Sequence, residues 1–190
     1  KGGAKMNLRH QILDYIPKDE QEKEDKEMMI FYMDTFNDVL TRNNKVCHFT
    51  SSAFVINQEK TKVLMEYHNI YKSWTWEGGH ADGESDLLSV AVREVEEETG
   101  VKVLDYENSK IESLDILPTL GHFKHGKWVS AHLHLNVAYI FYADDTKTIR
   151  TRLVENSDVG WKNIDDIFCL SSERYMIPIY KKLIKIVKQS

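Results

Sequence analysis

The pattern of apolar and polar positions along the chain predicts strands on both sides of one central helix. Short segments rich in Val, Ile, Phe and Thr alternate with polar residues or run as buried stretches, as strands do. Polar turns, such as those at 57–60 and 124–127, separate neighbouring segments and favour hairpins. The predicted strands are 46–57, 62–68, a short strand that carries Trp74 and Trp76, 111–123, 129–143 and 159–162.

Helices are predicted before, between and after these strands. Apolar residues return at helical spacing in the second half of 19–43, after a charged run at 18–26. Either Ser85 or Asp86 is suited to cap the central helix, and Gly100 is suited to end it. The predicted helical segments are 7–17, 19–43, the central helix to Thr99, a helical turn at 163–168 and a final helix at 172–188.

This order of elements predicts one α/β domain with an extension. Strands on both sides of a central helix, with a terminal helix outside, favour a mixed sheet in an α/β sandwich. The expected division is an N-terminal helical extension at 1–45 and a domain at 46–190, which a length of 190 residues allows. The extension either packs its apolar face on the domain, or forms a dimer contact or a lid over the substrate pocket.

Composition and charge narrow the class of protein. Hydrophobic residues make up 42% of the chain and charged residues 29%, which is ordinary for a globular protein. A net charge of −5 argues against a nucleic acid polymer as partner. No apolar stretch reaches membrane-spanning length, and no signal peptide is visible. We therefore expect no membrane partner. Cys47 and Cys169 lack metal-ligand spacing, so we expect reduced cysteines in a cytoplasmic protein.

A dense acidic cluster carries the strongest chemical signal. Residues 93–101 read REVEEETGV, and four of them are glutamates. On a helix, Glu94, Glu97 and Glu98 stand at i, i+3 and i+4 and project from one face. Their mutual repulsion disfavours the helix unless a cation binds, and hard oxygen ligands suit Mg²⁺ or Mn²⁺. The alternative is a solvated acidic helix face.

The segment 79–101 resembles the signature of the Nudix hydrolase family. Gly79 supplies the first glycine, Arg93-Glu94-Val95 the triplet, Glu97-Glu98 the pair and Gly100-Val101 the ending. One position departs from the signature, because Ser85 stands where a glutamate is expected and Glu84 lies one residue early. In the family that glutamate mainly supports the arginine.

The resemblance implies a Nudix-type α/β/α sandwich and a metal-dependent hydrolase. The implied reaction cleaves a diphosphate linkage in a nucleoside diphosphate derivative or a related small molecule. Glu94, Glu97 and Glu98 would hold Mg²⁺ or Mn²⁺, joined by a backbone carbonyl of Gly79 or its neighbour Gly78. Arg93 would hold a carboxylate in place.

The family also supplies a loop carboxylate that acts as metal ligand or general base. Glu155 is the best candidate for that role, and Asp158 is the second. The alternative is that Glu155 is a loop residue without a catalytic role. A Glu155→Gln change is expected to reduce turnover far more than binding if the residue takes part.

Several residues are candidates for substrate binding. His132 and His134 share one face of a strand, where they form either a wall of the substrate pocket or hydrogen-bonded histidines of the sheet. A zinc site is the weaker alternative, because no third ligand lies near them in the sequence. His80 follows the glycines and either contacts phosphate or caps the loop. Trp76 either stacks on a flat group or packs in the core. His48 could face the pocket from the first strand.

Two other functions remain open on this fold. The segment 48–54 and the pair Gly79-His80 have some similarity to isopentenyl diphosphate isomerases, but the cysteine that those enzymes place before the pair is Gly78 here. The fold also serves non-catalytic sensors of nucleotide ligands, although such a sensor does not require the three glutamates. The small-molecule substrate, the choice between Mg²⁺ and Mn²⁺, and a possible homodimer are not determined by the sequence.

Overall fold

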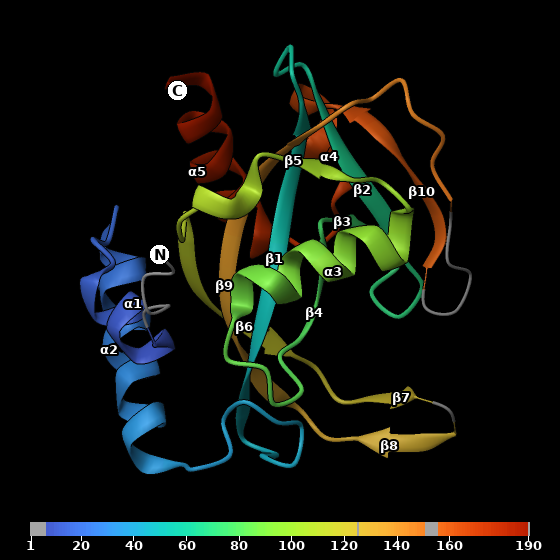
Figure 1. Cartoon of the computed structure of the whole chain (residues 1–190). Helices are drawn as coiled ribbons and strands as arrows, with labels where there is room; N and C mark the ends of the chain where they lie inside the picture. The colour runs from blue at the N-terminus through green and yellow to red at the C-terminus, as the bar shows by residue number, and fades with distance from the viewer. Residues whose placement is uncertain (1–6, 125, 151–155, 190) are drawn as a thin grey trace.

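A mixed β-sheet forms the centre of the molecule (Figure 1). The computed structural model describes residues 7–124, 126–150 and 156–189. Within these residues eight strands form the sheet in the order β10-β2-β1-β9-β5, with β3 added to β2, β4 to β1 and β6 to β9. The strands are β1 (Cys47–Asn57), β2 (Lys62–His68), β3 (Ser73–Thr75), β4 (Glu77–His80), β5 (Val103–Leu104), β6 (Ser113–Thr119), β9 (His132–Ala143) and β10 (Asn156–Asn163). A separate hairpin pairs β7 (His122–Lys124) with β8 (Lys127–Val129).

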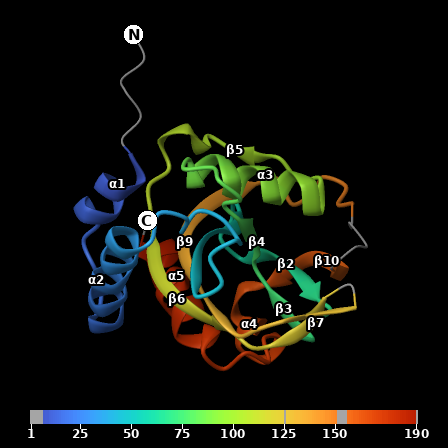
Figure 2. The ribbon, with the colours of Figure 1, turned by 90° about the horizontal axis from the view of Figure 1, so that it is seen from below.

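The sheet is covered by helices on both faces. Helix α3 (Leu87–Thr99) lies on one face, and α4 (Ile167–Leu170) and α5 (Met176–Gln189) lie on the other (Figure 2). The 3₁₀ turns η1 (Tyr106–Asn108) and η2 (Ile164–Asp166) join elements at the edges. Strand β1 is buried along its whole length because its side chains alternate between two cores. Phe49 and Val55 pack on the α3 side, whereas Phe54 and Ile56 pack on the α5 side.

Local sequence fixes both ends of α3. The Asp86 side chain accepts a hydrogen bond from the Ser89 amide at 3.4 Å, so of the two predicted caps Asp86 is the one used. Gly100 ends the helix in the left-handed conformation, with φ at 69°. The apolar face, which includes Val90 and Val95, is fully buried. The acidic residues are therefore left along the opposite side and the flank of the helix.

The N-terminal extension packs against the domain. Helices α1 (Leu8–Asp14) and α2 (Glu20–Thr35) lie beside β6 at one edge of the sheet (Figures 1 and 2). Ile12 and Met29 are fully buried and belong to the same core as α3. Packing on the domain, one of the predicted alternatives, buries part of their apolar face, whereas Met28 and Phe31 of α2 stay exposed.

A buried ionic network ties the extension to both α5 and β6. Lys182 on α5 lies 2.6 Å from Glu22 on α2 and 3.1 Å from Asp115 on β6. Both carboxylates are almost fully buried, with 0% and 1% of their surface exposed. The Tyr15 hydroxyl donates a further hydrogen bond to Glu22 at 2.8 Å. Each buried charge therefore has a partner, as burial of charge requires.

Several predicted elements begin or end at other residues in the structure; the first helix, for example, covers Leu8–Asp14 rather than 7–17. Helix α2 ends at Thr35 rather than 43, because the backbone becomes extended at Phe36. Further along, the carbonyl of Val39 accepts from the amide of Phe49 at 2.7 Å. The predicted strand 111–123 is interrupted after Thr119, and its end becomes part of the small hairpin. The last helix begins at Met176 rather than 172.

Candidate active site

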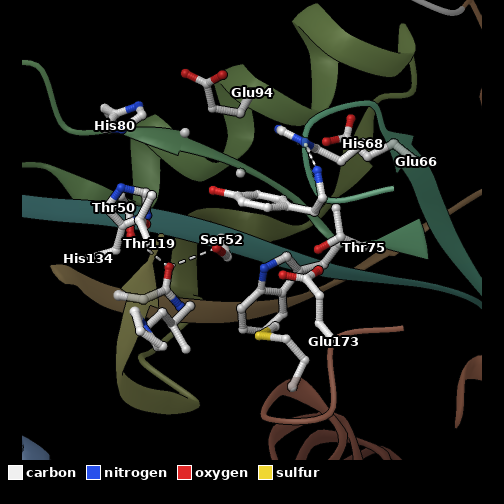
Figure 3. A pocket seen from close by; sticks show the side chains of 18 of the residues that line it. Thr50, Ser52, Glu66, His68, Thr75, His80, Glu94, Thr119, His134 and Glu173 are labelled. Atoms are coloured by element: carbon white, nitrogen blue, oxygen red, sulfur yellow. Dashed lines mark hydrogen bonds between the residues drawn. The ribbon is translucent and has the colours of Figure 1, made fainter. Parts of the chain in front are cut away.

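A cleft of about 310 Å³ lies where β1, β4 and β9 meet the flank of α3. Figure 3 shows Glu94 on one side of it, and Thr50, Ser52 and His134 on the sheet. Its far end is lined by Glu66, His68 and Glu173. Polar and aromatic side chains from segments far apart in the sequence therefore converge on one concave surface.

Two of the three predicted metal-binding carboxylates face this cleft. Glu94 and Glu98 line it, whereas Glu97 is not part of the lining and its side chain is 48% exposed. Arg93 Nη2 donates to Glu94 Oε1 at 3.1 Å, and Arg93 Nε lies 4.0 Å from Glu97. Burial raises the pKa of Glu94 despite the guanidinium beside it. Arg93 therefore contacts Glu94, and its role in holding a carboxylate for metal binding stays a prediction.

The three carboxylates do not converge to ligand distance of one another. Among the described residues, the group whose possible ligand atoms all lie within 4.8 Å consists of histidines and includes none of the glutamates. Like charges repel, and Arg93 takes a position between Glu94 and Glu97. The donor set still fits a hard divalent cation, because three carboxylates project from one helix and two of them line the cleft.

The two glycines before the site are there for different steric reasons. A Cβ at Gly79 would lie 2.4 Å from Cδ of Glu94, so only glycine lets the strand approach that carboxyl group. A Cβ at Gly78 would lie 2.8 Å from the backbone oxygen of Ser51 and 2.7 Å from Ser52 Oγ. Gly79 thus lies directly against the carboxyl group of Glu94, and its place among the metal ligands stays a prediction.

The departure from the signature has a structural counterpart. Glu84 Oε1 accepts a hydrogen bond from the amide of Asp86 at 2.8 Å, so its recorded contact supports the start of α3 rather than Arg93. Glu155 lies outside the described residues. Asp158 is exposed on β10 and accepts from the amide of Val159 at 2.8 Å, and it does not line the cleft.

The predicted histidines gather at one end of the cleft. His80 and His134 line it, and His132 Nε2 lies 3.1 Å from His134 Nε2. His48, which sequence reasoning placed only as a possible pocket residue, is 4% exposed and lies among them. Burial lowers the pKa of His80 to about 4 and the pKa of His134 well below its usual value.

Trp76 combines both roles that the sequence left open. It lines the cleft, yet it is only 6% exposed and packs edge-on against Tyr180, with ring centroids 5.6 Å apart. Asn136 was not identified from the sequence. Its Oδ1 accepts from Thr50 and Ser52 at 3.0 and 2.8 Å, which leaves its buried Nδ2 without a partner among the described residues. The one signal for it is an amide within an apolar strand.

Glu77 was also missed by sequence reasoning. It is fully buried, and neither carboxylate oxygen has a hydrogen-bond partner among the described residues. Burial raises its pKa well above the usual value, and the charge of Glu98 raises it further. Two cationic side chains, Arg42 and Lys124, complete the cleft lining. Arg42 pairs with Asp82 through two hydrogen bonds, of 2.8 and 2.7 Å.

Comparisons with known proteins give a consistent result. A family model described as the NUDIX domain matches residues 48–184. An Ap4A hydrolase from C. elegans, solved as a binary complex, is 15% identical with a TM-score of 0.53, covering 75% of this chain and 98% of that one. A MutT protein from Bacillus halodurans is 21% identical with a TM-score of 0.51, covering 72% of this chain and 81% of that one. These likenesses show a shared fold. No curated protein sequence matches significantly.

Proposed function

The chain belongs to the Nudix family, and from this premise we propose that it is a divalent-metal-dependent hydrolase that cleaves the diphosphate linkage of a nucleoside diphosphate derivative or a related small molecule. The family match and the α/β/α sandwich confirm the predicted family, fold and class of enzyme, a hydrolase of phosphoanhydride bonds. The proposal goes further, to the metal and the class of substrate. The names of the two similar structures, an Ap4A hydrolase and a MutT protein, are compatible with a nucleotide substrate.

The observation that carries the proposal is the position of the acidic helix. Glu94 and Glu98 line the same cleft as Gly78 and Gly79, so the acidic helix and the glycine strand meet at one place. We assign Glu94, Glu97, Glu98 and the carbonyl of Gly79 as ligands for Mg²⁺ or Mn²⁺. When bound, such an ion neutralises phosphate charge and lowers the pKa of a bound water.

The other cleft residues would bind and orient the substrate. Arg93 keeps the Glu94 carboxylate in place by its hydrogen bond. The Nδ2 group of Asn136 is a buried donor without a partner among the described residues, and it is suited to a substrate oxygen. Trp76 offers an aromatic wall, and His80 and His134 offer imidazole nitrogens, with His132 adjacent. The negative charge of a diphosphate would face Arg42 and Lys124.

Glu155 remains the proposed loop carboxylate, as a general base or a metal ligand. Glu155→Gln is expected to reduce kcat by about 10²-fold or more, with little change in substrate affinity, because the change removes a charge and keeps the shape. Asp158→Asn is the matched control, since Asp158 is exposed and outside the cleft. Normal turnover by the Glu155→Gln protein would remove the residue from the mechanism.

A substrate panel with Mg²⁺ or Mn²⁺ tests the proposal directly. Nucleotides and nucleotide sugars are incubated with the protein, and the products are identified by mass spectrometry. For the compound that turns over, Glu98→Gln is expected to reduce kcat by about 10²-fold or more. Glu96→Gln makes the same change on an exposed part of the same helix and should leave kcat within about twofold. Equal rates for the two variants would contradict the assigned site.

The same panel separates hydrolysis from the two alternatives. An isomerase would keep the diphosphate on its product, and a sensor would bind one compound tightly without turnover. The cleft offers little for the isomerase, because no cysteine lines it among the described residues. Cys47 is buried in the core on the α3 side and Cys169 is exposed elsewhere.

Compartment and assembly are also proposals. Both cysteines are free thiols, and on that ground we propose a reducing, cytoplasmic location. None of the described helices has the length and apolar character needed to cross a bilayer. A homodimer stays a prediction, and light scattering after size-exclusion chromatography would measure it.

A further inference from the structure

Four histidines from three strands meet at one end of the cleft. His48 lies on β1, His80 ends β4, and His132 and His134 lie on β9. The parallel register of β1 and β9 sets His48 beside His134, and β4 brings His80 to the other side of β1. The ring centroid of His48 lies 4.9 to 5.2 Å from the ring centroids of the other three histidines. Figure 3 shows His80 and His134 at this end.

The local hydrogen bonds fix where the lone pairs of two rings point. His48 Nδ1 lies 3.1 Å from the carbonyl oxygen of Asn44, and His132 Nδ1 lies 2.8 Å from that of Ser130. A carbonyl oxygen only accepts, so Nδ1 carries the proton in both rings and Nε2 carries a lone pair. This arrangement, with one nitrogen held by a backbone carbonyl, is how metal-binding histidines are oriented.

The Nε2 atom of His48 needs a partner that the described residues do not provide. The side chain is 4% exposed and this nitrogen makes no hydrogen bond within the described residues. A buried acceptor left unsatisfied is unfavourable, because it has lost its hydrogen bond to water. His48, His80 and His134 each offer a nitrogen, and these nitrogens all lie within 4.8 Å of one another. A cation among them would satisfy the buried lone pair.

His132 orients His134 through a hydrogen bond. Because Nε2 of His132 carries a lone pair, Nε2 of His134 donates to it at 3.1 Å. The lone pair of the His134 ring is then on Nδ1. A neutral imidazole binds metal ions through Nε2 or Nδ1, so the rings of His48, His80 and His134 each have an atom suited to the ion.

We propose that His48, His80 and His134 bind one transition-metal ion of the zinc class, with His132 holding the His134 ring in position through its hydrogen bond. Imidazole nitrogens suit zinc and related ions, whereas the carboxylates of α3 suit Mg²⁺ or Mn²⁺. One cleft would therefore hold two chemically different metal sites. The two sites share no ligand, although His80 directly follows Gly79.

The histidine site is tested by metal binding alone, without turnover. Chelator-treated full-length protein is titrated with Zn²⁺ against a chromogenic chelator, in excess Mg²⁺ that competes for carboxylate sites. We expect one Zn²⁺ per chain, and Co²⁺ in its place should give the visible absorption of a nitrogen-coordinated tetrahedral ion. His80→Asn is expected to raise the Kd by more than about 100-fold, because loss of an outer partner alone costs roughly 10–100-fold.

Two control proteins make the outcome specific. His10→Asn changes an exposed histidine on α1 and should bind Zn²⁺ as the unchanged protein does. The double variant Glu94→Gln/Glu98→Gln should also keep Zn²⁺ while losing Mg²⁺-dependent turnover. Circular dichroism checks that His80→Asn is folded, and His48→Asn provides a second ligand variant. The proposal is overturned by absent stoichiometric binding, by unchanged Zn²⁺ affinity in both ligand variants, or by loss of binding only in the glutamate variant.

Discussion

Alanine at two adjacent glycines should produce two opposite phenotypes. At Gly79 the added Cβ would lie 2.4 Å from Cδ of Glu94, the far end of a flexible side chain. At Gly78 it would lie 2.8 Å from the backbone oxygen of Ser51, which cannot rotate away. We therefore expect Gly79→Ala to reduce activity with little loss of stability, and Gly78→Ala to reduce stability.

The expected loss of activity in Gly79→Ala follows from the contact distance. Carbon atoms pack at about 3.5–4.0 Å, so a contact of 2.4 Å forces the Glu94 carboxyl to move by about 1 Å or more. A misplacement of about 1 Å at a reacting centre costs about 10²-fold in rate, or roughly 2.7 kcal/mol. Because the side chain can move, the free energy of unfolding should change by less than about 1 kcal/mol.

The magnitude at Gly78 is a stability effect. Overpacking against backbone costs about 1–3 kcal/mol. For a chain of this size each kcal/mol lowers Tm by about 2–4 °C, so Gly78→Ala should lower Tm by about 2–12 °C. Its remaining folded fraction should still bind Mn²⁺.

Three measurements on matched proteins decide the outcome. Tm by calorimetry, kcat on the substrate found in the panel, and Mn²⁺ affinity by electron paramagnetic resonance are compared. Gly160→Ala is the control, because its nearest contact would be a lysine nitrogen at 3.8 Å and its backbone is extended. If Gly79→Ala turns over normally, or loses activity only in step with Tm, the assigned packing of Gly79 on Glu94 is wrong.

Three further predictions concern buried charges. Lys182→Met leaves two buried carboxylates without their cation and should lower the free energy of unfolding, measured in urea, by about 3–5 kcal/mol. The control Lys188→Met breaks an exposed pair and should lower it by less than about 1 kcal/mol. Equal losses would contradict the network. Burial lowers the pKa of His80 from 6.5 to about 4, so the unfolded chain takes up the proton first. The contribution of His80 to the free energy of unfolding is fully present above about pH 6.5, and up to about 3 kcal/mol of it is lost towards pH 4. His80→Asn, measured in the presence of a chelator, should flatten this decline. Burial raises the pKa of Glu77, so the folded state keeps its proton to higher pH than the unfolded chain, and stability falls as pH rises above 4.5. Glu77→Gln should remove this decline. An unchanged pH profile would show that Glu77 is not the cause.

Much of the fold could be read from the sequence because its signals are local. The cap Asp86 and the stop Gly100 are set by neighbouring backbone groups, and both are used as predicted. The 11 residues of β1 and the hairpin to β2 follow from apolar runs and a polar turn. The predicted end of α2 was wrong, because the backbone becomes extended at Phe36 and the following segment makes a non-local hydrogen bond, from the amide of Phe49 to the carbonyl of Val39.

The candidate site divides in the same way. The row of Glu94, Glu97 and Glu98 lies on one helix, so helical periodicity alone predicts a shared face. Which of these side chains line the cleft depends on how α3 sits against β4. That contact is set by Gly79, whose missing Cβ makes room for Glu94. The partner of Arg93 was likewise not readable, because a one-residue shift places Glu84 on the amide of Asp86.

The sequence by itself determined the family, the acidic helix and the alternation of strands, because each depends on residues close together along the chain. Only the tertiary structure decided which distant side chains meet. His48 and His134 are 86 positions apart in the sequence, yet they are register partners in the sheet. Glu22, Asp115 and Lys182 form one buried network from three separate elements. Strand order and helix packing fix such contacts, and no spacing along the chain encodes them.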